Sequence, residues 1–156
     1  MKSGDLDDTT VPVRLKLSAL WTAIMFCYIY GDFWGLYRPG NLRGILDGQG
    51  PLGPTSQGTL VAVAILVAVP AIMIFLSTAA PRQLTRWLNI LMSTILTVII
   101  LLTLPGAWAF YIVMSAIEIT LQVLIVWYAW RWPSAGFAAL RPAPDRPLGV
   151  ASERRQ

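Results

Sequence analysis

Four long apolar stretches, separated by short polar or Gly/Pro-rich segments, dominate the pattern of hydrophobic and polar positions along the chain. They cover about residues 15–36, 58–80, 87–104 and 107–132. A helix of roughly 20 residues rises about 30 Å, which is the thickness of the hydrocarbon core of a bilayer. The pattern therefore predicts an all-α, polytopic membrane protein whose domain, residues 15–132, is a four-transmembrane-helix bundle.

The segments that connect the predicted spans contain helix-breaking residues. Residues 38–57 are rich in Gly and Pro and are predicted to form an outer loop, in which 42–46 can make a short interfacial turn. Residues 81–86 are predicted to form a short basic turn. Pro70 lies near the centre of the second span and predicts a kink there, because proline removes a hydrogen-bond donor from a helix.

The two ends of the chain differ from the spans in composition. Residues 1–14 begin polar and acidic, and they lack the basic region and the small-residue cleavage site of a signal peptide. We therefore expect the first span to be retained. Residues 133–156 carry several Pro and Arg residues with few bulky apolar ones, which predicts a disordered tail.

The basic residues orient the predicted bundle. Only 13% of the residues are charged, whereas a soluble domain carries about 25%. Of the 12 basic residues, Arg38 and Arg43 are the two that fall on the side of the outer loop. The positive-inside rule then places both termini in the cytoplasm. Because topology and anionic lipid account for the basic residues, we expect no nucleic-acid partner.

The aromatic residues agree with this orientation, since Trp and Tyr favour the two membrane interfaces. The predicted inner half is bracketed by Trp21, Trp87, Trp127, Trp130 and Trp132, and the outer face by Trp34, Tyr37, Trp108 and Tyr111.

Missing residue types exclude several kinds of chemistry. The chain has no His and a single Cys, Cys27, so sites with His or paired Cys ligands for zinc, haem or iron–sulfur clusters are excluded. We expect no metal and no cofactor, and Cys27 is interpreted as an inert, buried small side chain. No internal repeat supports an inverted-repeat transporter, and no Gly-rich motif has the spacing of a phosphate-binding loop.

A carboxylate, Glu118, lies near the predicted middle of the fourth span. It is about eleven residues from the outer end of the span, or roughly 16 Å deep. A charge at this depth is costly, so the side chain must face the bundle interior, be neutral or be paired. Tyr111, Ser115, Glu118 and Gln122 follow one another at steps of four, three and four residues and form one polar stripe. The stripe is compatible with an interhelical hydrogen-bond seam, with a ligand or proton site, or with a contact between protomers.

A second carboxylate, Asp32, lies near the outer end of the first span, one turn above Tyr28. It is compatible with an interfacial acid that meets water, Arg38 or Arg43, and also with a polar gate above Glu118. The two depths differ by about 10 Å at 1.5 Å per residue, so we expect no direct carboxylate pair. A shared cavity that opens outward remains compatible with these depths.

The third span carries a further polar stripe. Asn89, Ser93 and Thr97 lie four residues apart and therefore share one helix face. Small hydroxyl side chains in membrane helices mostly bond their own backbone or a neighbouring helix, so this stripe is interpreted as packing.

Several short motifs resemble a family of small bacterial four-span integral membrane proteins of unestablished activity. The motifs are Leu15–Trp21, Tyr28–Tyr37 followed by Arg38-Pro39-Gly40, Gly50–Pro54, Arg86–Ile90, Leu104–Trp108 and Ile125–Trp130. The resemblance covers roughly residues 11–133. It implies a four-span fold and a location in the bacterial inner membrane, and it transfers no functional residue. A looser likeness to DoxX-like four-helix membrane proteins rests on size and span number alone.

Three functions are compatible with these features. The first is the non-enzymatic binding of a lipid or small apolar molecule in an outward-facing pocket, for which the candidate lining residues are Glu118, Gln122, Ser115, Tyr111, Asp32 and Tyr28. The second is a small proton-coupled carrier or channel that acts as a homodimer. The third is an intramembrane isomerase or cyclase with Glu118 as general acid and Asp32 as its partner. We favour a non-enzymatic function, because isolated carboxylates occur in membrane helices for other reasons.

Overall fold

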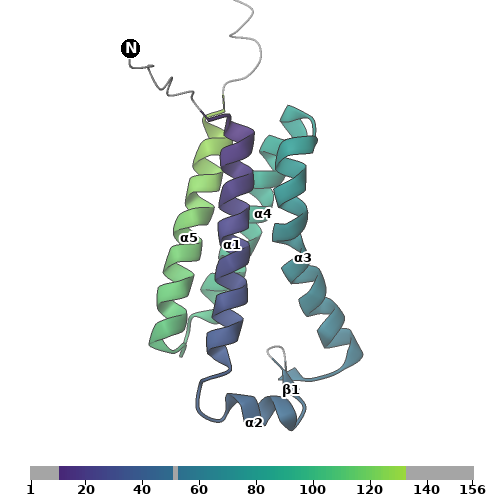
Figure 1. The fold of residues 1–156 in the computed structure, drawn as a ribbon, viewed down its shortest axis with the longest axis vertical. Coiled ribbons are helices and arrows are strands. Elements are labelled where there is room, and N and C mark those ends of the chain that lie inside the picture. The colour runs from purple at the N-terminus through teal and green to yellow at the C-terminus, as the bar shows by residue number, and fades with distance from the viewer. Residues whose placement is uncertain (1–10, 51–52, 133–156) are drawn as a thin grey trace, which may run out of the picture.

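A computed structural model of the chain describes residues 11–50 and 53–132 (Figure 1). Its elements, in chain order, are α1 (Val13–Gly35), α2 (Asn41–Leu46), β1 (Gln49–Gly50), β2 (Gly53–Pro54), α3 (Gln57–Ala79), α4 (Arg82–Thr103) and α5 (Ala109–Trp130). The helices α1, α3, α4 and α5 are each long and apolar enough to cross a membrane. They lie side by side as a bundle, which confirms the predicted all-α four-span architecture (Figure 1).

The two ends of the bundle have different compositions. At one end α1 and α4 begin and α3 and α5 end, and we call it the basic end because it carries Arg14, Lys16, Arg82, Arg86 and Arg131. At the other end residues 36–56 connect α1 to α3, and we call it the loop end. The two names refer to the ends of the bundle and carry no orientation in the membrane. That the basic end faces the cytoplasm stays a prediction.

The helices begin and end within two residues of the predicted spans, except at the start of α4. Residues 82–86, predicted to form a turn, are instead the beginning of this helix. Pro81 takes the N-cap position with φ −56° and ψ 145°, and no breaker follows it. The prediction placed both arginines in a short basic turn that precedes the helix. Their long side chains can instead carry the charge from a helical position to the membrane surface.

The bundle is packed tightly in only one of its halves. Its apolar core consists of Leu17, Trp21, Ile24, Met73, Leu96 and Ile125. On α1 no residue beyond Ile24 is buried, and on α3 no residue before Pro70 is buried. By contrast, α4 is buried at intervals from Thr85 to Ile100 and α5 from Ser115 to Ala129. The loop-end halves of α1 and α3 therefore cover the other two helices only loosely.

The shape of α3 accounts for part of this difference. The helix bends near its middle, and its loop-end half leans away from α1 (Figure 1). Pro70 lies inside the helix and has no N–H for the carbonyl of Leu66, while its ring crowds the preceding turn. Beyond the bend, Ser56 and Thr59 form a capping box that starts the helix. The predicted kink thus separates a packed half of α3 from an unpacked one.

The segment between α1 and α3 crosses the loop end of the bundle as a short helix and a small hairpin (Figure 1). Gly40 and Gly48 have φ values of 81° and 79°, which favour glycine, and they flank α2. In the hairpin, β1 pairs antiparallel with β2, with Gln49 opposite Pro54 and Gly50 opposite Gly53. The helix α2 occupies almost the same residues as the turn predicted for 42–46.

Candidate functional site

Much of the buried core is polar, which is unusual for a bundle of apolar helices. Seven buried residues have polar or charged side chains, against nine that are hydrophobic. We call these seven the polar column: Ser77, Thr85, Asn89, Ser93, Ser115, Glu118 and Gln122. Because hydrocarbon offers no hydrogen bonds, each of these side chains needs a partner within the bundle or a ligand.

The polar column lies inside the bundle because its members repeat at helical spacing. On α4, Thr85, Asn89 and Ser93 are four residues apart and share one buried face. On α5, Ser115, Glu118 and Gln122 do the same at steps of three and four. The two faces meet where Thr97 Oγ1 lies 3.2 Å from Gln122 Oε1.

Near the basic end, the column is fully hydrogen-bonded through Asn89. Its Oδ1 accepts from Trp21 Nε1 at 2.7 Å and from Ser77 Oγ at 3.3 Å. Its Nδ2 donates to the carbonyl of Thr85 at 2.8 Å. One fully buried amide thereby connects α1, α3 and α4. We call Trp21, Ser77, Thr85 and Asn89 the Asn89 network and assign it a structural role.

Trp21, which the sequence analysis placed among the aromatic residues that bracket the inner half, is buried inside the bundle. Its side chain is 0% exposed and belongs to the core. The residue is eight positions after the start of α1, about 12 Å along the helix axis at 1.5 Å per residue. At that depth the indole N–H needs an acceptor, which Asn89 supplies.

Further from the basic end, the column lacks hydrogen-bond partners. Gln122 Nε2 and Ser93 Oγ are buried atoms without a partner in the structure. Thr97 has one hydroxyl proton, which it can give to Ser93 O at 2.8 Å or to Gln122 Oε1 at 3.2 Å, but not to both at once. We call Ser93, Thr97, Ser115, Glu118 and Gln122 the Glu118 group. Within this group, some buried polar atoms have no hydrogen-bond partner in the described part of the chain.

Glu118 itself is 7% exposed. Within residues 11–50 and 53–132 it forms no hydrogen bond or ion pair with another side chain. Asp32 and Tyr28 of α1 lie near enough for electrostatic interaction with its carboxyl group. The fold thus brings the two carboxylates to one region without a direct contact. This part of the chain holds no cluster of three or more His, Cys, Asp or Glu side chains that could bind a metal ion.

The remaining candidate residues surround the loop-end side of Glu118. Asp32 is exposed and Tyr28 is half-buried. Tyr111 is half-buried and its hydroxyl is hydrogen-bonded to Thr103 Oγ1 at 2.8 Å, so it ties α5 to α4. Arg38, considered as a partner of Asp32, lies instead over the ring of Trp108 at 5.9 Å. Cys27, expected to be buried, is half-buried because the loop-end half of α1 is loosely covered.

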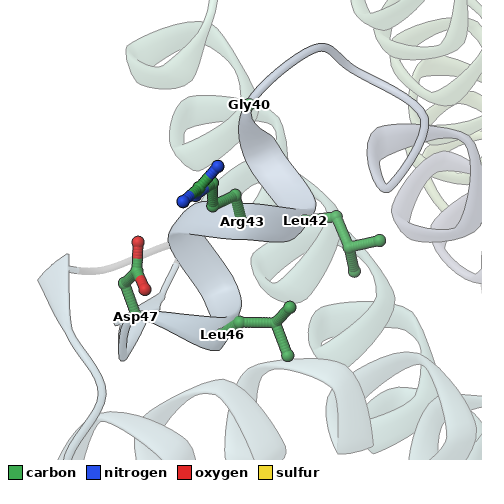
Figure 2. A pocket seen from close by; sticks show the side chains of 5 residues that line it. All are labelled: Gly40, Leu42, Arg43, Leu46 and Asp47. Carbon is green, nitrogen blue, oxygen red and sulfur yellow. The ribbon is translucent and has the colours of Figure 1, made fainter.

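A hollow of about 650 Å³ lies along α2, away from the Glu118 group. It is lined by Gly40, Leu42, Arg43, Leu46 and Asp47. Figure 2 shows the two leucines pointing to one side of α2 and Arg43 and Asp47 to the other. Because these side chains diverge, the hollow is an open groove along a small amphipathic helix and not the pocket expected at Glu118.

Some participants in the column were not singled out from the sequence. Ser77 and Thr85 lie on either side of the α3–α4 turn and look like ordinary end-of-helix residues. Ser77 contributes its hydroxyl to Asn89, and Thr85 contributes its backbone carbonyl. Every residue has a backbone carbonyl, so the sequence does not indicate which one accepts a hydrogen bond from a distant side chain. The signal that was available was an Asn in an apolar helix, which the third-span stripe contained.

Comparison with known sequences adds a family and no activity. A sequence model described as "Family of unknown function (DUF6326)" matches residues 9–139, which is most of the chain. No curated protein and no solved structure matches it.

Proposed function

Because this chain belongs to the DUF6326 family, whose function is unknown, we propose from the geometry of the bundle that it binds an amphipathic small molecule or lipid. The polar end of the ligand reaches the Glu118 group, and its apolar part lies between the loop-end halves of α1 and α3. The proposal refines the binding function considered from the sequence. A purely apolar molecule would leave the buried polar atoms without partners.

The observation that carries the proposal is the lack of partners in the Glu118 group. Buried polar atoms are normally hydrogen-bonded, and those that are not indicate a missing water, ion or ligand. Gln122 Nε2 can donate a hydrogen bond, Ser93 Oγ can donate or accept, and the carboxyl of Glu118 can accept. A hydroxyl, amide or amine group on the ligand would complement this set.

The packing of the helices supports access to the site from the membrane. Glu118 lies in the loop-end half of α5, which is the half of the bundle in which α1 and α3 have no buried residues. Large apolar side chains on α3 such as Val61 and Ile65 are 52% and 64% exposed there. An alkyl or isoprenoid chain can therefore pack against these helices without displacing the core.

Native mass spectrometry of the protein, released gently from its own membrane, tests the proposal. We expect the wild-type chain to retain one small molecule at fixed stoichiometry. In Glu118→Gln the retained fraction should fall about tenfold or more, because a hydrogen bond to a charged group contributes about 1.5–3 kcal/mol. Asp47→Asn is the matched control, since it also removes one carboxylate but lies in the loop-end segment. Equal loss in both variants, or no retained molecule in the wild type, would contradict the proposal.

The polar column also favours a second candidate function, a proton-coupled carrier or channel. Polar side chains follow one another from Glu118 through Gln122, Thr97 and Ser93 to Asn89, each about one helical turn or one helix contact from the next. In proteoliposomes with an imposed pH gradient, this function predicts proton flux that Glu118→Gln abolishes. If vesicles that contain correctly folded protein show no proton flux, the carrier or channel function is contradicted and ligand binding is the one candidate left. A homodimer would be expected for a carrier with four spans.

A further inference from the structure

The basic end of the bundle gathers cationic side chains from several helices without acidic ones. It carries Arg14, Lys16, Arg82, Arg86 and Arg131. The acidic residues between 11 and 132 are Asp32, Asp47 and Glu118, and none of them lies at this end. Among the described residues, these cations therefore have no carboxylate with which to form an ion pair. Within residues 11–50 and 53–132, the charge at this end is uncompensated.

Two of these arginines meet at one aromatic ring. The guanidinium groups of Arg14 and Arg82 lie 5.6 Å and 5.5 Å from the centre of the Trp132 ring. The contact brings together the beginning of α1, the beginning of α4 and the end of α5. Like charges repel, and the ring offsets part of this repulsion for each guanidinium group, so an anion beside both groups would stabilise the arrangement further.

The arginines differ in what else they bind. Arg14 Nη1 donates to the carbonyls of Thr78 and Ala80 at 2.7 and 2.8 Å and so caps the end of α3. Arg86 Nη2 donates to the carbonyl of Trp130 at 3.3 Å, while its Nε is buried without a partner. For Arg82 the structure records the contact with Trp132 and no side-chain hydrogen bond within the described residues. Arg82 is thus held, among the described residues, by a cation–π contact alone, as Lys16 and Arg131 are.

The helix ends add to the positive potential. Both α1 and α4 begin after a proline, without a side-chain cap and without an acidic residue in the first turn. The first N–H groups of a helix carry a partial positive charge, so arginines in these turns are unfavourable unless an anion lies beside them.

We propose that Arg14, Arg82 and Trp132 form a binding site for the phosphate of an anionic phospholipid at the basic end. Its two guanidinium groups bind the phosphate oxygens, and the indole lies at the depth of the headgroup, where tryptophan is favoured. A phospholipid is the occupant favoured here because the site stands at the end of four membrane-crossing helices, where headgroups lie. This site is separate from the Glu118 group and does not depend on the function proposed there.

The proposal is tested with the full chain, delipidated in a neutral detergent and titrated with short-chain phosphatidylglycerol or phosphatidylcholine. Quenching or enhancement of tryptophan fluorescence, checked by adduct counting in native mass spectrometry, gives the affinity. We expect phosphatidylglycerol to bind at least tenfold more tightly than phosphatidylcholine. In Arg82→Gln this preference should fall at least fivefold, without a loss of folding, because Arg82 forms no side-chain hydrogen bond to the described part of the bundle.

Further variants separate the alternatives. Arg43→Gln, which removes one arginine at the loop end, should leave the preference unchanged, and Arg14→Lys should retain most of it because the charge is kept. An unchanged preference in Arg82→Gln, or an equal loss in Arg43→Gln, would overturn the proposal. Competition by inorganic phosphate at similar concentrations would assign the site to a soluble phosphate instead. Tight phosphatidylglycerol binding that appears only after Asp5, Asp7 and Asp8 are changed to Asn would assign the site to the chain's own acidic segment.

Discussion

Replacing Asn89 with alanine is expected to lower the free energy of unfolding by about 2 kcal/mol. The substitution removes three hydrogen bonds at once and leaves the indole N–H of Trp21 buried without an acceptor. It also disconnects α1 and α3 from α4 at the point where the bundle is packed most tightly. Titration with SDS in mixed micelles, followed by far-UV circular dichroism, measures the change.

The control for Asn89→Ala lies five residues further along the same helix. Thr94 is exposed and bonds only the carbonyl of Ile90, so Thr94→Ala should change the free energy of unfolding by less than about 0.5 kcal/mol. In a double-mutant cycle, Trp21→Phe and Asn89→Ala should be less than additive, because each removes the same hydrogen bond. A cost below about 0.5 kcal/mol for Asn89→Ala, or full additivity, would show that the Asn89 network does not stabilise the bundle.

Glu118→Leu is expected to change the free energy of unfolding in the opposite direction to Asn89→Ala. In the ligand-free protein this substitution should raise the free energy of unfolding by about 2 kcal/mol, because Glu118, which is 7% exposed and has no hydrogen bond to another described side chain, is replaced by an apolar side chain of similar size. The same variant should lose the retained molecule. Stability gained together with binding lost is typical of a site that is kept for function.

A lipid-facing position on the same helix provides the comparison. Thr120 is exposed and bonds only the carbonyl of Ala116, so Thr120→Leu should leave both stability and ligand retention nearly unchanged. If Glu118→Leu instead destabilises the ligand-free protein by more than about 1 kcal/mol, its carboxyl group has a structural partner. The polar stripe on α5 would then be the packing seam considered from the sequence.

The architecture could be predicted because its signals are local. Span length, Pro81 before α4 and the proline within α3 act over a few residues, and the four helices appear close to where the pattern placed them. The start of α4 was missed because residue type alone made Arg82 and Arg86 look like a turn. In three dimensions, their side chains reach Trp132 and the end of α5 while the backbone stays helical.

The polar interior was only partly predictable, because it depends on which helices meet. Helical spacing was enough to place Ser115, Glu118 and Gln122 on one face, whose role in ligand binding stays a proposal. The same spacing marked Asn89, but Trp21 and Ser77, its partners, lie 68 and 12 residues away. Nothing local indicates such pairs. The loose packing of the loop-end half could not be predicted from the sequence either. Apolar residues are the same residue types whether they face a neighbouring helix or lipid.

The long separation between Trp21 and Asn89 has a consequence for biosynthesis. Ribosomes add about 5–20 residues per second, so the 68 residues between the two side chains take roughly 3–14 s to synthesise. During this interval α1 has entered the bilayer with an indole N–H that lacks its native acceptor. The first span can therefore reach its final packing only after the third has been inserted. A translational pause before α4 would lengthen the time for which α1 can pair with the wrong helix.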